Sequence, residues 1–240
     1  ETSVCTLDAQ TADRLILVSN AVQLTIEGIT LTNGYRTTVG GAGVYLTAGS
    51  TLNLEDAIFI SNKGSSTLIP GGAVYADGSY VYANDSYFYD SYGFGGVSYG
   101  GTWEANNCIF LSNQGGTTIH SGGVATGRDT SVPPSWTATN CIFKDNWAYS
   151  KGGVFRQVNF TADHCTFEAN FANQLLVVGG GVAYSGTAYV SDCTFIGNYA
   201  DDGSIGDGGV FYEMTVVATN CANGSFGRSF KGYPFQIRPD

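Results

Sequence analysis

Apolar and polar residues alternate in short segments that recur along the chain. In Leu52-Asn53-Leu54, for example, two apolar residues flank a polar one. A period of two indicates a strand with one buried face. No stretch keeps a period of 3.6 together with capping residues, so we expect little helix. The flanking apolar pairs are Leu52/Leu54, Val81/Ala83, Trp103/Ala105, Trp136/Ala138, Phe160/Ala162, Ala188/Val190 and Val216/Ala218.

Each alternating segment leads into a short motif that is repeated with few changes. Four copies are NNCIFLSN (106–113), TNCIFKDN (139–146), DHCTFEAN (163–170) and SDCTFIGN (191–198). Between successive motifs lies a Gly-Gly-Val/Ala step, as in Gly152-Gly153-Val154. These two anchors, the Phe motif and the Gly-Gly step, alternate along the chain, while the number of residues between them varies. This is typical of a solenoid with one unit per coil and loops of different length.

Stacking such coils in parallel places equivalent residues above one another, about 4.8 Å apart, so the motif forms columns. We expect a Phe column that stacks rings through the core, and a Cys column beside it that fills space with small side chains. The residue before each Cys reads as a turn position, and the Gly pairs read as sharp corners. The Phe column is Leu31, Phe59, Phe88, Phe110, Phe143, Phe167 and Phe195; the Cys column is Ile29, Ala57, Ser86, Cys108, Cys141, Cys165, Cys193 and Cys221; the turn column is Gly28, Asp56, Asp85, Asn107, Asn140, His164, Asp192 and Asn220.

The paired anchors also resemble a known family. GGAVY (71–75) with AIFISN (57–62), and GGVFR (152–156) with CTFEAN (165–170), are similar to the GG[AV] and F-x-x-N repeats of the polymorphic outer-membrane protein family. The resemblance covers about residues 20–225, with Ser91 in place of an Asn and CANGSF in place of the last Phe motif. It implies a right-handed parallel β-helix with a passenger-like, adhesive or surface-structural role.

We therefore predict an all-β, single-stranded, right-handed parallel β-helix of about eight coils, with residues 1–240 as one domain. Residues 1–20 form a leading segment, residues 21–225 the repeat coils and residues 226–240 a C-terminal tail. With 13% aromatic and only 12% charged residues, the composition is that of a folded chain rather than a disordered one.

The net charge of −10 argues against two classes of partner. Nucleic acids and anionic membrane surfaces both attract Lys- and Arg-rich proteins, so we expect neither. No apolar run approaches the ~20 residues that span a bilayer, so we expect no membrane insertion. The sequons at Asn84, Asn159 and Asn223 predict glycosylation and an extracellular or cell-surface location. No signal peptide is recognisable, so we expect a mature secreted form.

The cysteines leave two interpretations open. Five of the six occupy the Cys column on consecutive coils, and Cys5 stands apart in the leading segment. The spacing contains no C-x₂₋₄-C pair of the kind that binds zinc. Neighbouring thiols lie within disulfide range, but side chains that point in parallel strain the bond, which favours a buried thiol ladder. A catalytic Cys is not expected.

Carboxylates are the other candidates for chemistry, because many parallel β-helices are carbohydrate-active enzymes that gather acids on one outer face. Asp56 and Asp85 fall in the turn column on adjacent coils, and Glu27 and Glu55 form a second pair. No Arg or Lys occupies neighbouring positions of that column, so ordinary solvated acids are the simpler interpretation. We interpret the two histidines, His120 and His164, as structural. We predict no catalytic residue, metal site or cofactor.

Two further segments carry alternatives. The loop DDGSIGDGG (201–209) can hold calcium through Asp201, Asp202 and Asp207, but it lacks the EF-hand order and a closing Glu, so we favour an ordinary acidic loop. The tyrosine-rich run at 79–101 cannot point all its rings inward. Exposed Tyr is enriched at protein interfaces and sugar-binding surfaces, although simple outward filler is the alternative. Its tyrosines are Tyr80, Tyr82, Tyr87, Tyr89, Tyr92 and Tyr99.

The ends of the predicted helix suggest its partner. Terminal coils leave backbone groups unpaired, which invites further pairing. The leading coil is apolar (RLILV, 14–18), and the tail SFKGYPFQIRPD (229–240) is aromatic and strand-like. We predict an extracellular structural or adhesive protein whose copies join head to tail through residues 1–20 and 226–240, or that meets surface glycans or proteins. The tail can instead fold back as a cap and leave a monomer. A carbohydrate-active enzyme (lyase, hydrolase or epimerase type) and a glycan-binding module are the alternative functions.

Overall fold

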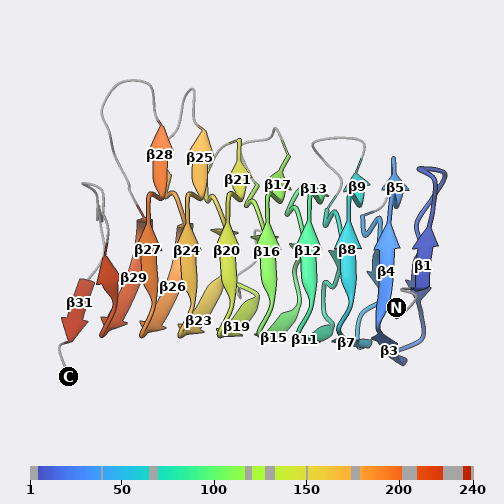
Figure 1. The fold of residues 1–240 in the computed structure, drawn as a ribbon, viewed down its shortest axis with the longest axis horizontal. Helices are drawn as coiled ribbons and strands as arrows, with labels where there is room; N and C mark the ends of the chain where they lie inside the picture. The colour runs from blue at the N-terminus through green and yellow to red at the C-terminus, as the bar shows by residue number, and fades with distance from the viewer. Residues whose placement is uncertain are drawn as a thin grey trace.

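The chain winds into a stack of parallel coils that run along one axis (Figure 1). The computed structural model describes residues 5–38, 40–64, 70–116, 121–127, 133–149, 151–173, 179–201, 210–223 and 235–238. All regular secondary structure in these ranges is strand, and every strand pairing is parallel. Each complete coil adds one strand to each of two sheets, A and C, and contributes to both rows of a third, sheet B.

Sheets A and C each contain one strand per coil. Sheet A is β1 (Cys5–Asp8), β4 (Ile29–Thr32), β8 (Ile58–Ile60), β12 (Tyr87–Tyr89), β16 (Ile109–Leu111), β20 (Ile142–Lys144), β24 (Thr166–Glu168), β27 (Thr194–Ile196) and β30 (Ala222–Asn223). Sheet C is β5 (Tyr35–Arg36), β9 (Lys63–Gly64), β13 (Tyr92–Gly93), β17 (Gln114–Gly115), β21 (Trp147–Ala148), β25 (Phe171–Asn173) and β28 (Tyr199–Asp201).

Sheet B has two rows of strands, which two long strands join near the C-terminal end. The first row is β2 (Ile16–Val18), β6 (Val44–Leu46), β10 (Val74–Tyr75), β14 (Ser98–Tyr99), β18 (Ala125–Thr126) and β22 (Phe155–Arg156). The second row is β3 (Gln23–Glu27), β7 (Thr51–Glu55), β11 (Tyr80–Asn84), β15 (Thr102–Asn106), β19 (Ser135–Thr139) and β23 (Asn159–Asp163). The long strands β26 (Ala183–Ser191) and β29 (Phe211–Thr219) run through both rows, and β31 (Phe235–Arg238) follows β29.

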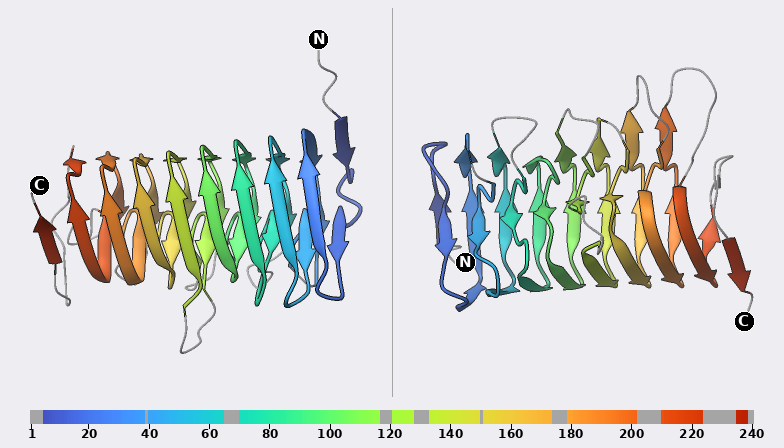
Figure 2. Two further views of the ribbon diagram at one scale, coloured as in Figure 1. Left: turned by 90° about the horizontal axis from the view of Figure 1, so that it is seen from below. Right: turned by 180° about the vertical axis from the view of Figure 1, so that it is seen from behind.

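In the described ranges, seven coils pass through all three sheets, because sheet C has seven strands. A partial coil extends the stack at each end, with β1 to β3 before the complete coils and β30 and β31 after them. Figure 2 shows these partial coils at opposite ends of the molecule. The predicted parallel stack of about eight coils therefore agrees with the structure.

The centre of the stack is the Phe column. All six phenylalanines and Leu31 are fully buried. Successive rings stack nearly parallel, with centroids 4.8 Å apart for Phe110 and Phe143 and 5.0 Å apart for Phe88 and Phe110. Trp136 meets Phe110 edge-on. Such ring pairs stabilise by about 0.5–1.5 kcal/mol beyond the area that they bury.

The turn column is confirmed by the backbone. All eight of its residues have positive φ, from 49° at Asp56 to 62° at Gly28. Gly, Asn and Asp adopt this left-handed conformation at the least cost, which explains why they dominate the column. The turn redirects the chain from the second row of sheet B into sheet A.

The Asn of the F-x-x-N motif has a role that the pattern did not reveal. Asn62, Asn113, Asn146, Asn170 and Asn198 are buried and form a ladder of side-chain amides. The backbone N–H of Asn113, for example, donates to Asn146 Oδ1 at 3.0 Å. Ser91 takes the place of Asn in one coil, and its buried hydroxyl has no hydrogen-bond partner among the described residues. The ladder satisfies buried backbone groups at a corner where the strands end.

The second Gly of each Gly-Gly step allows coils to approach closely. A Cβ on Gly123 would lie 2.0 Å from the carbonyl oxygen of Gly153, its equivalent in the next coil. Gly153 has the same relationship with Gly181, at 1.9 Å. The predicted corners are therefore present, and steric crowding excludes any side chain at this second position.

Candidate functional site

The Cys column is a ladder of free thiols. Cys108, Cys141, Cys165 and Cys193 are buried, and Cys221 is half-buried. Cys141 Sγ donates to the Thr139 carbonyl at 3.3 Å and to the Ala105 carbonyl of the preceding coil at 3.4 Å. Hydrogen bonds with neighbouring thiols of the column, and then burial, raise the pKa of Cys141 and of Cys193. Hydrogen bonds with the same neighbouring thiols lower the pKa of Cys108 and lower that of Cys165 to about 4. Because all four of these side chains are buried, reaction partners have no access to them, and the interior of the ladder has a packing role.

The sequence placed Cys5 apart from this column, and the structure corrects that prediction. β1 pairs with β4 in a register that sets Cys5 opposite Ile29, which is itself a member of the column. Cys5 is therefore the first residue of the Cys column, and it is exposed. The relationship was hidden because the next three coils carry Ile29, Ala57 and Ser86 at this position.

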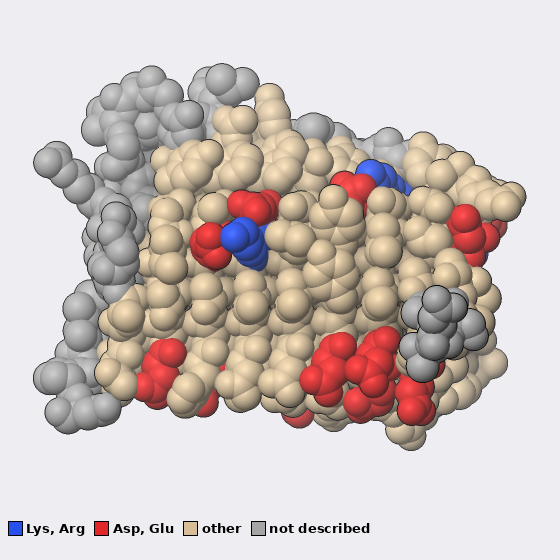
Figure 3. Space-filling view, viewed as in Figure 1, with Lys and Arg blue, Asp and Glu red and all other residues tan. Residues whose placement is uncertain are grey.

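The two predicted carboxylate pairs lie on one corner of the stack. Glu27 and Glu55 are opposite each other in the β3–β7 register, and Asp56 and Asp85 occupy the adjoining turns. Glu55 accepts a hydrogen bond from Asn84 Nδ2 at 2.7 Å. In Figure 3, acidic residues gather at the lower right without a Lys or Arg among them. The corner is therefore a surface of accessible acids without a neighbouring base in that view.

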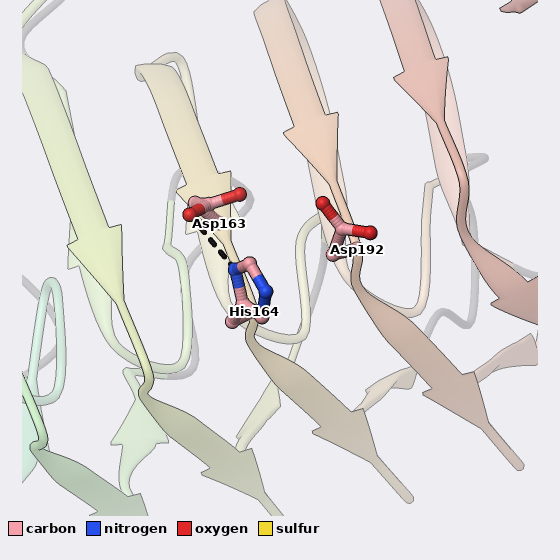
Figure 4. Close-up of side chains that lie close together, drawn as sticks. All are labelled: Asp163, His164 and Asp192. Carbon is pink, nitrogen blue, oxygen red and sulfur yellow. Dashed lines mark hydrogen bonds and ion pairs between the residues drawn. The ribbon is translucent and has the colours of Figure 1, made fainter. Parts of the chain in front are cut away.

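A second cluster joins residues that the sequence pattern left separate. Oxygen or nitrogen atoms of Asp163, His164 and Asp192 lie within 4.8 Å of one another. Asp163 ends β23, His164 is the following turn residue, and Asp192 is the turn residue of the next coil (Figure 4). His164 Nδ1 lies 2.9 Å from Asp163 Oδ2, and the Ser191 hydroxyl donates to Asp163 Oδ1 at 2.6 Å.

The electrostatics of this cluster follow from those contacts. The hydrogen bond with Asp163 and the charge of that carboxylate raise the pKa of His164. The Ser191 hydroxyl and then His164 lower the pKa of Asp163. The carboxylate lies between the hydroxyl and the imidazole, whereas a catalytic triad needs the imidazole in the middle. Ser191 is therefore not activated by His164. Imidazole and carboxylates are also metal-ligand types, but here they form an open surface cluster of three side chains.

Sequence reasoning missed this cluster because it treated the columns one at a time. His164 and Asp192 share the turn column, whereas Asp163 belongs to the neighbouring column. The cluster can be found in the sequence by comparing two neighbouring columns over two adjacent coils.

The tyrosine-rich run does not form one patch. Tyr80 and Tyr82 lie on β11, Tyr87 and Tyr89 on β12, and the remaining two on sheet C and on the first row of sheet B. The rings therefore encircle the stack as a belt around one coil. One open groove of about 360 Å³ lies beside Tyr80, and its lining includes Asp77, Thr102, Pro134 and Ser135.

The three sequons lie at strand ends or on a terminal strand. Asn84 ends β11 and Asn159 begins β23; both side chains are half-buried. Asn84 Oδ1 accepts a hydrogen bond from Asn106 at 3.3 Å, and Asn159 Oδ1 accepts one from the Thr187 backbone at 3.0 Å. Asn223 lies on β30 opposite Phe195, in the row of the Phe column. His120 and the loop residues Asp202 and Asp207 lie outside the described residues, while Asp201 ends β28.

Among the described residues, the terminal strands at both ends of the stack pair on one side only. At the N-terminal end, Leu7 and Leu17 are 42% and 59% exposed, and an open depression of about 350 Å³ is lined by Ile16, Leu17, Val18, Val22 and Leu24, among others. At the other end, β31 pairs in parallel with β29. The described part of the tail thus extends the stack by one strand and does not fold back across it.

Comparison with known proteins agrees with this architecture. Residues 14–221 match the family described as the right-handed β-helix region. The chain belongs to this family. Membership in the right-handed β-helix family confirms the predicted fold and its handedness, but a shared fold does not assign a function. No curated protein and no solved structure matches the chain. In the ranges that the structure describes, no helix is long and apolar enough to cross a membrane.

Proposed function

We propose that the protein is an extracellular structural or adhesive β-helix whose copies join head to tail. The observation that carries this proposal is that the strands at the two ends of the stack belong to the same sheets. Both partial coils contribute strands to the same rows: β1 and β30 belong to sheet A, and β3 and β31 to the second row of sheet B. Adding the first coil of one copy to the last coil of another therefore continues two sheets at once.

The registers predict which residues would meet. β31 pairs with β29 so that Phe235 is opposite Val216 and Arg238 is opposite Thr219. Followed coil by coil through sheet B, these two rows begin at Leu24 and Glu27 in β3. A second copy would therefore set its Leu24 against Phe235 and its Glu27 against Arg238. An apolar pair and a pair of opposite charges support one fixed register.

The physical driving force is the backbone edge of each terminal strand, which pairs with no other strand in the part of the chain that the structure describes. The two edges of a parallel strand are unlike and complementary, so the contact joins two different ends. A contact of this kind does not close on itself, and its repetition gives an open filament. The resemblance to polymorphic outer-membrane repeats and the three sequons support a cell-surface or secreted setting.

Charge exchange tests the proposal. We expect the mean mass of the reduced wild-type protein in light scattering to rise with concentration. Glu27→Arg and Arg238→Glu should each lower it towards the monomer, since each sets like charges together at the contact. The double variant restores the opposite pair and should restore assembly. Glu104→Arg is the matched control, because Glu104 is an exposed residue of β15 in the middle of the stack. Equal loss of assembly in Glu104→Arg, or no effect of either end variant, would contradict the proposal.

A glycan-binding module is the second candidate, and the groove beside Tyr80 is the observation that favours it. An exposed ring next to hydroxyl and carboxylate groups is a composition suited to sugars. The described lining of the groove holds one carboxylate, Asp77, and no Lys, Arg or His. This favours binding over a lyase, hydrolase or epimerase, which need a paired acid and base. Loss of glycan-array signal in Tyr80→Ala, with Tyr189→Ala as an exposed control, would support it.

A further inference from the structure

Cys5 and Cys221 are the outermost described members of the Cys column, one at each end of the stack. Cys5 is opposite Ile29 in the β1–β4 register. Ala222 is opposite Thr194 in the β27–β30 register, so Cys221 directly follows Cys193 in the column. Every coil between these two cysteines contributes one residue to the same column. If β31 of one copy pairs with β3 of the next in the register proposed above, β30 of the first copy therefore lies beside β1 of the second, with Cys221 opposite Cys5.

We infer that Cys221 of one copy and Cys5 of the next form a disulfide that locks neighbouring subunits together. This inference rests on the head-to-tail assembly proposed above. The partner is a second copy of this chain, because only a continuation of the same stack sets a β1 strand beside β30 with the two cysteines in one row.

The geometry of the junction suits the bond better than the interior of the column does. Adjacent parallel strands are about 4.8 Å apart, which lies within the Cα–Cα range of disulfides. Inside the stack, coils packed on both sides hold neighbouring thiols in parallel, and this strains a bond between them. At the junction the two strands belong to separate molecules, so a small shift between subunits can turn the Cβ atoms towards each other.

The accessibility of the thiols points to the same pair. Cys5 is exposed and Cys221 half-buried, whereas the four cysteines between them in the chain are buried. A hydrogen bond with the Cys193 thiol lowers the pKa of Cys221 to about 7. A thiolate is the attacking species in disulfide exchange, so Cys221 contributes a reactive thiol and Cys5 an exposed one.

The reaction needs an oxidant, and a small-molecule disulfide such as oxidised glutathione supplies it. The Cys5 thiolate attacks one sulfur of the oxidant, forms a mixed disulfide and releases one glutathione thiolate. The Cys221 thiolate of the neighbouring copy then attacks the Cys5 sulfur and releases the second. Two protein thiols are oxidised to one disulfide, and one glutathione disulfide is reduced to two thiols, which take up the two protons that the protein thiols lose.

Single-cysteine variants test the inference. After treatment with oxidised glutathione, wild-type protein should give a ladder of covalent oligomers on a non-reducing gel, and reductant should collapse it to monomer. Cys5→Ser and Cys221→Ser should each remain monomeric on that gel. A 1:1 mixture of the two should give covalent dimer and nothing larger, since each variant retains one reactive end. Peptide mapping should identify a Cys5–Cys221 link.

Cys165→Ser is the control for altered packing, because Ser86 already occupies this column. Ser86 Oγ donates to the Asn84 carbonyl at 2.8 Å, as Cys165 donates to Asp163 at 3.3 Å. This variant should keep the full ladder. A Cys5–Cys5 link, or a dimer from Cys221→Ser alone, would overturn the inference. Light scattering separates the two proposals: reduced protein that assembles but never cross-links refutes the disulfide alone, and protein that stays monomeric in both conditions refutes both.

Discussion

Asn146 Nδ2 donates a hydrogen bond to the carbonyl of Phe110, one coil earlier, at 2.8 Å. The same side chain accepts a hydrogen bond at Oδ1 from the backbone N–H of Asn113. One amide thus satisfies a donor and an acceptor of the preceding coil, both buried. The Phe column and the asparagine ladder are therefore one unit: rings provide apolar contact between coils, and amides satisfy the backbone where the strands of sheet A end.

This pairing predicts the cost of breaking the ladder. Asn146→Ala leaves the Phe110 carbonyl and the Asn113 N–H without this partner, and each unsatisfied buried group costs about 1–3 kcal/mol. For the two groups together, we expect the free energy of unfolding measured by urea denaturation to fall by about 2–6 kcal/mol. A loss below that measured for the exposed variant Asn106→Ala would contradict the role assigned to the ladder.

The reverse change should stabilise the protein. Ser91→Asn supplies the missing amide at the one described coil where the ladder is interrupted, and it removes a buried hydroxyl without a described partner. We expect the free energy of unfolding to rise by about 1 kcal/mol, the usual net contribution of a hydrogen bond. Ser112→Asn, at a positive-φ turn position of the next coil, is the control and should change stability little. A destabilised Ser91→Asn would show that this coil has no room for the amide.

The core stack predicts a large effect for Phe143. Its ring lies between those of Phe110 and Phe167, 4.8 Å from each. Phe143→Ala should lower the free energy of unfolding by about 3–5 kcal/mol. Ile142→Ala, at the preceding and exposed position, should change it by no more than about 0.5 kcal/mol. Similar losses for the two variants would contradict the assigned faces of β20.

The close approach of coils predicts that Gly123 tolerates no side chain. Gly123→Ala places a methyl group against the Gly153 carbonyl, so two backbones must separate. We expect the free energy of unfolding to fall by about 3 kcal/mol or more, at the upper end of the effects of overpacking a core. Gly197→Asp is the control, because the space around Gly197 is open and Asp145 has a similar φ at the equivalent turn. A stable, fully cooperative Gly123→Ala protein would contradict this packing.

The contact between His164 and Asp163 predicts a pH effect. Because Asp163 raises the pKa of His164 above 6.5, the protonated form is favoured in the folded protein. The stabilisation is present below pH 6.5, and it is lost as the pH rises through the raised pKa. NMR titration should find this pKa above 6.5, and Asp163→Asn should return it towards that value. An unchanged titration in Asp163→Asn would refute the coupling.

Glycosylation should be uneven. Asn84 and Asn159 are half-exposed at strand ends, whereas Asn223 lies in the row of the Phe column. We expect site-resolved mass spectrometry of secreted protein to find glycans at Asn84 and Asn159. Modification at Asn223 alone would contradict this assignment of faces.

Periodicity was sufficient to predict the fold because each coil repeats the same environment. Residues equivalent to Phe110 and Asn140 recur because each coil has the same local requirements. Phe110 fills a core position, and Asn140 adopts the left-handed conformation of the turn. The pattern did not predict the amide ladder, because its hydrogen bonds join residues 22 to 36 positions apart. It also missed the place of Cys5, whose register depends on β1 pairing with β4, and the proximity of Asp163 and Asp192 on adjacent coils.

The axial repeat of assembled protein tests the head-to-tail claim most directly. Sheet A has nine strands in the described residues, so one subunit occupies nine layers. At about 4.8 Å per layer, electron microscopy of the concentrated, reduced protein should reveal filaments with an axial rise of about 43 Å per subunit. Particles that remain single at all concentrations, with both termini intact, would contradict the account, as would a repeat of about twice that length from subunits that alternate in direction.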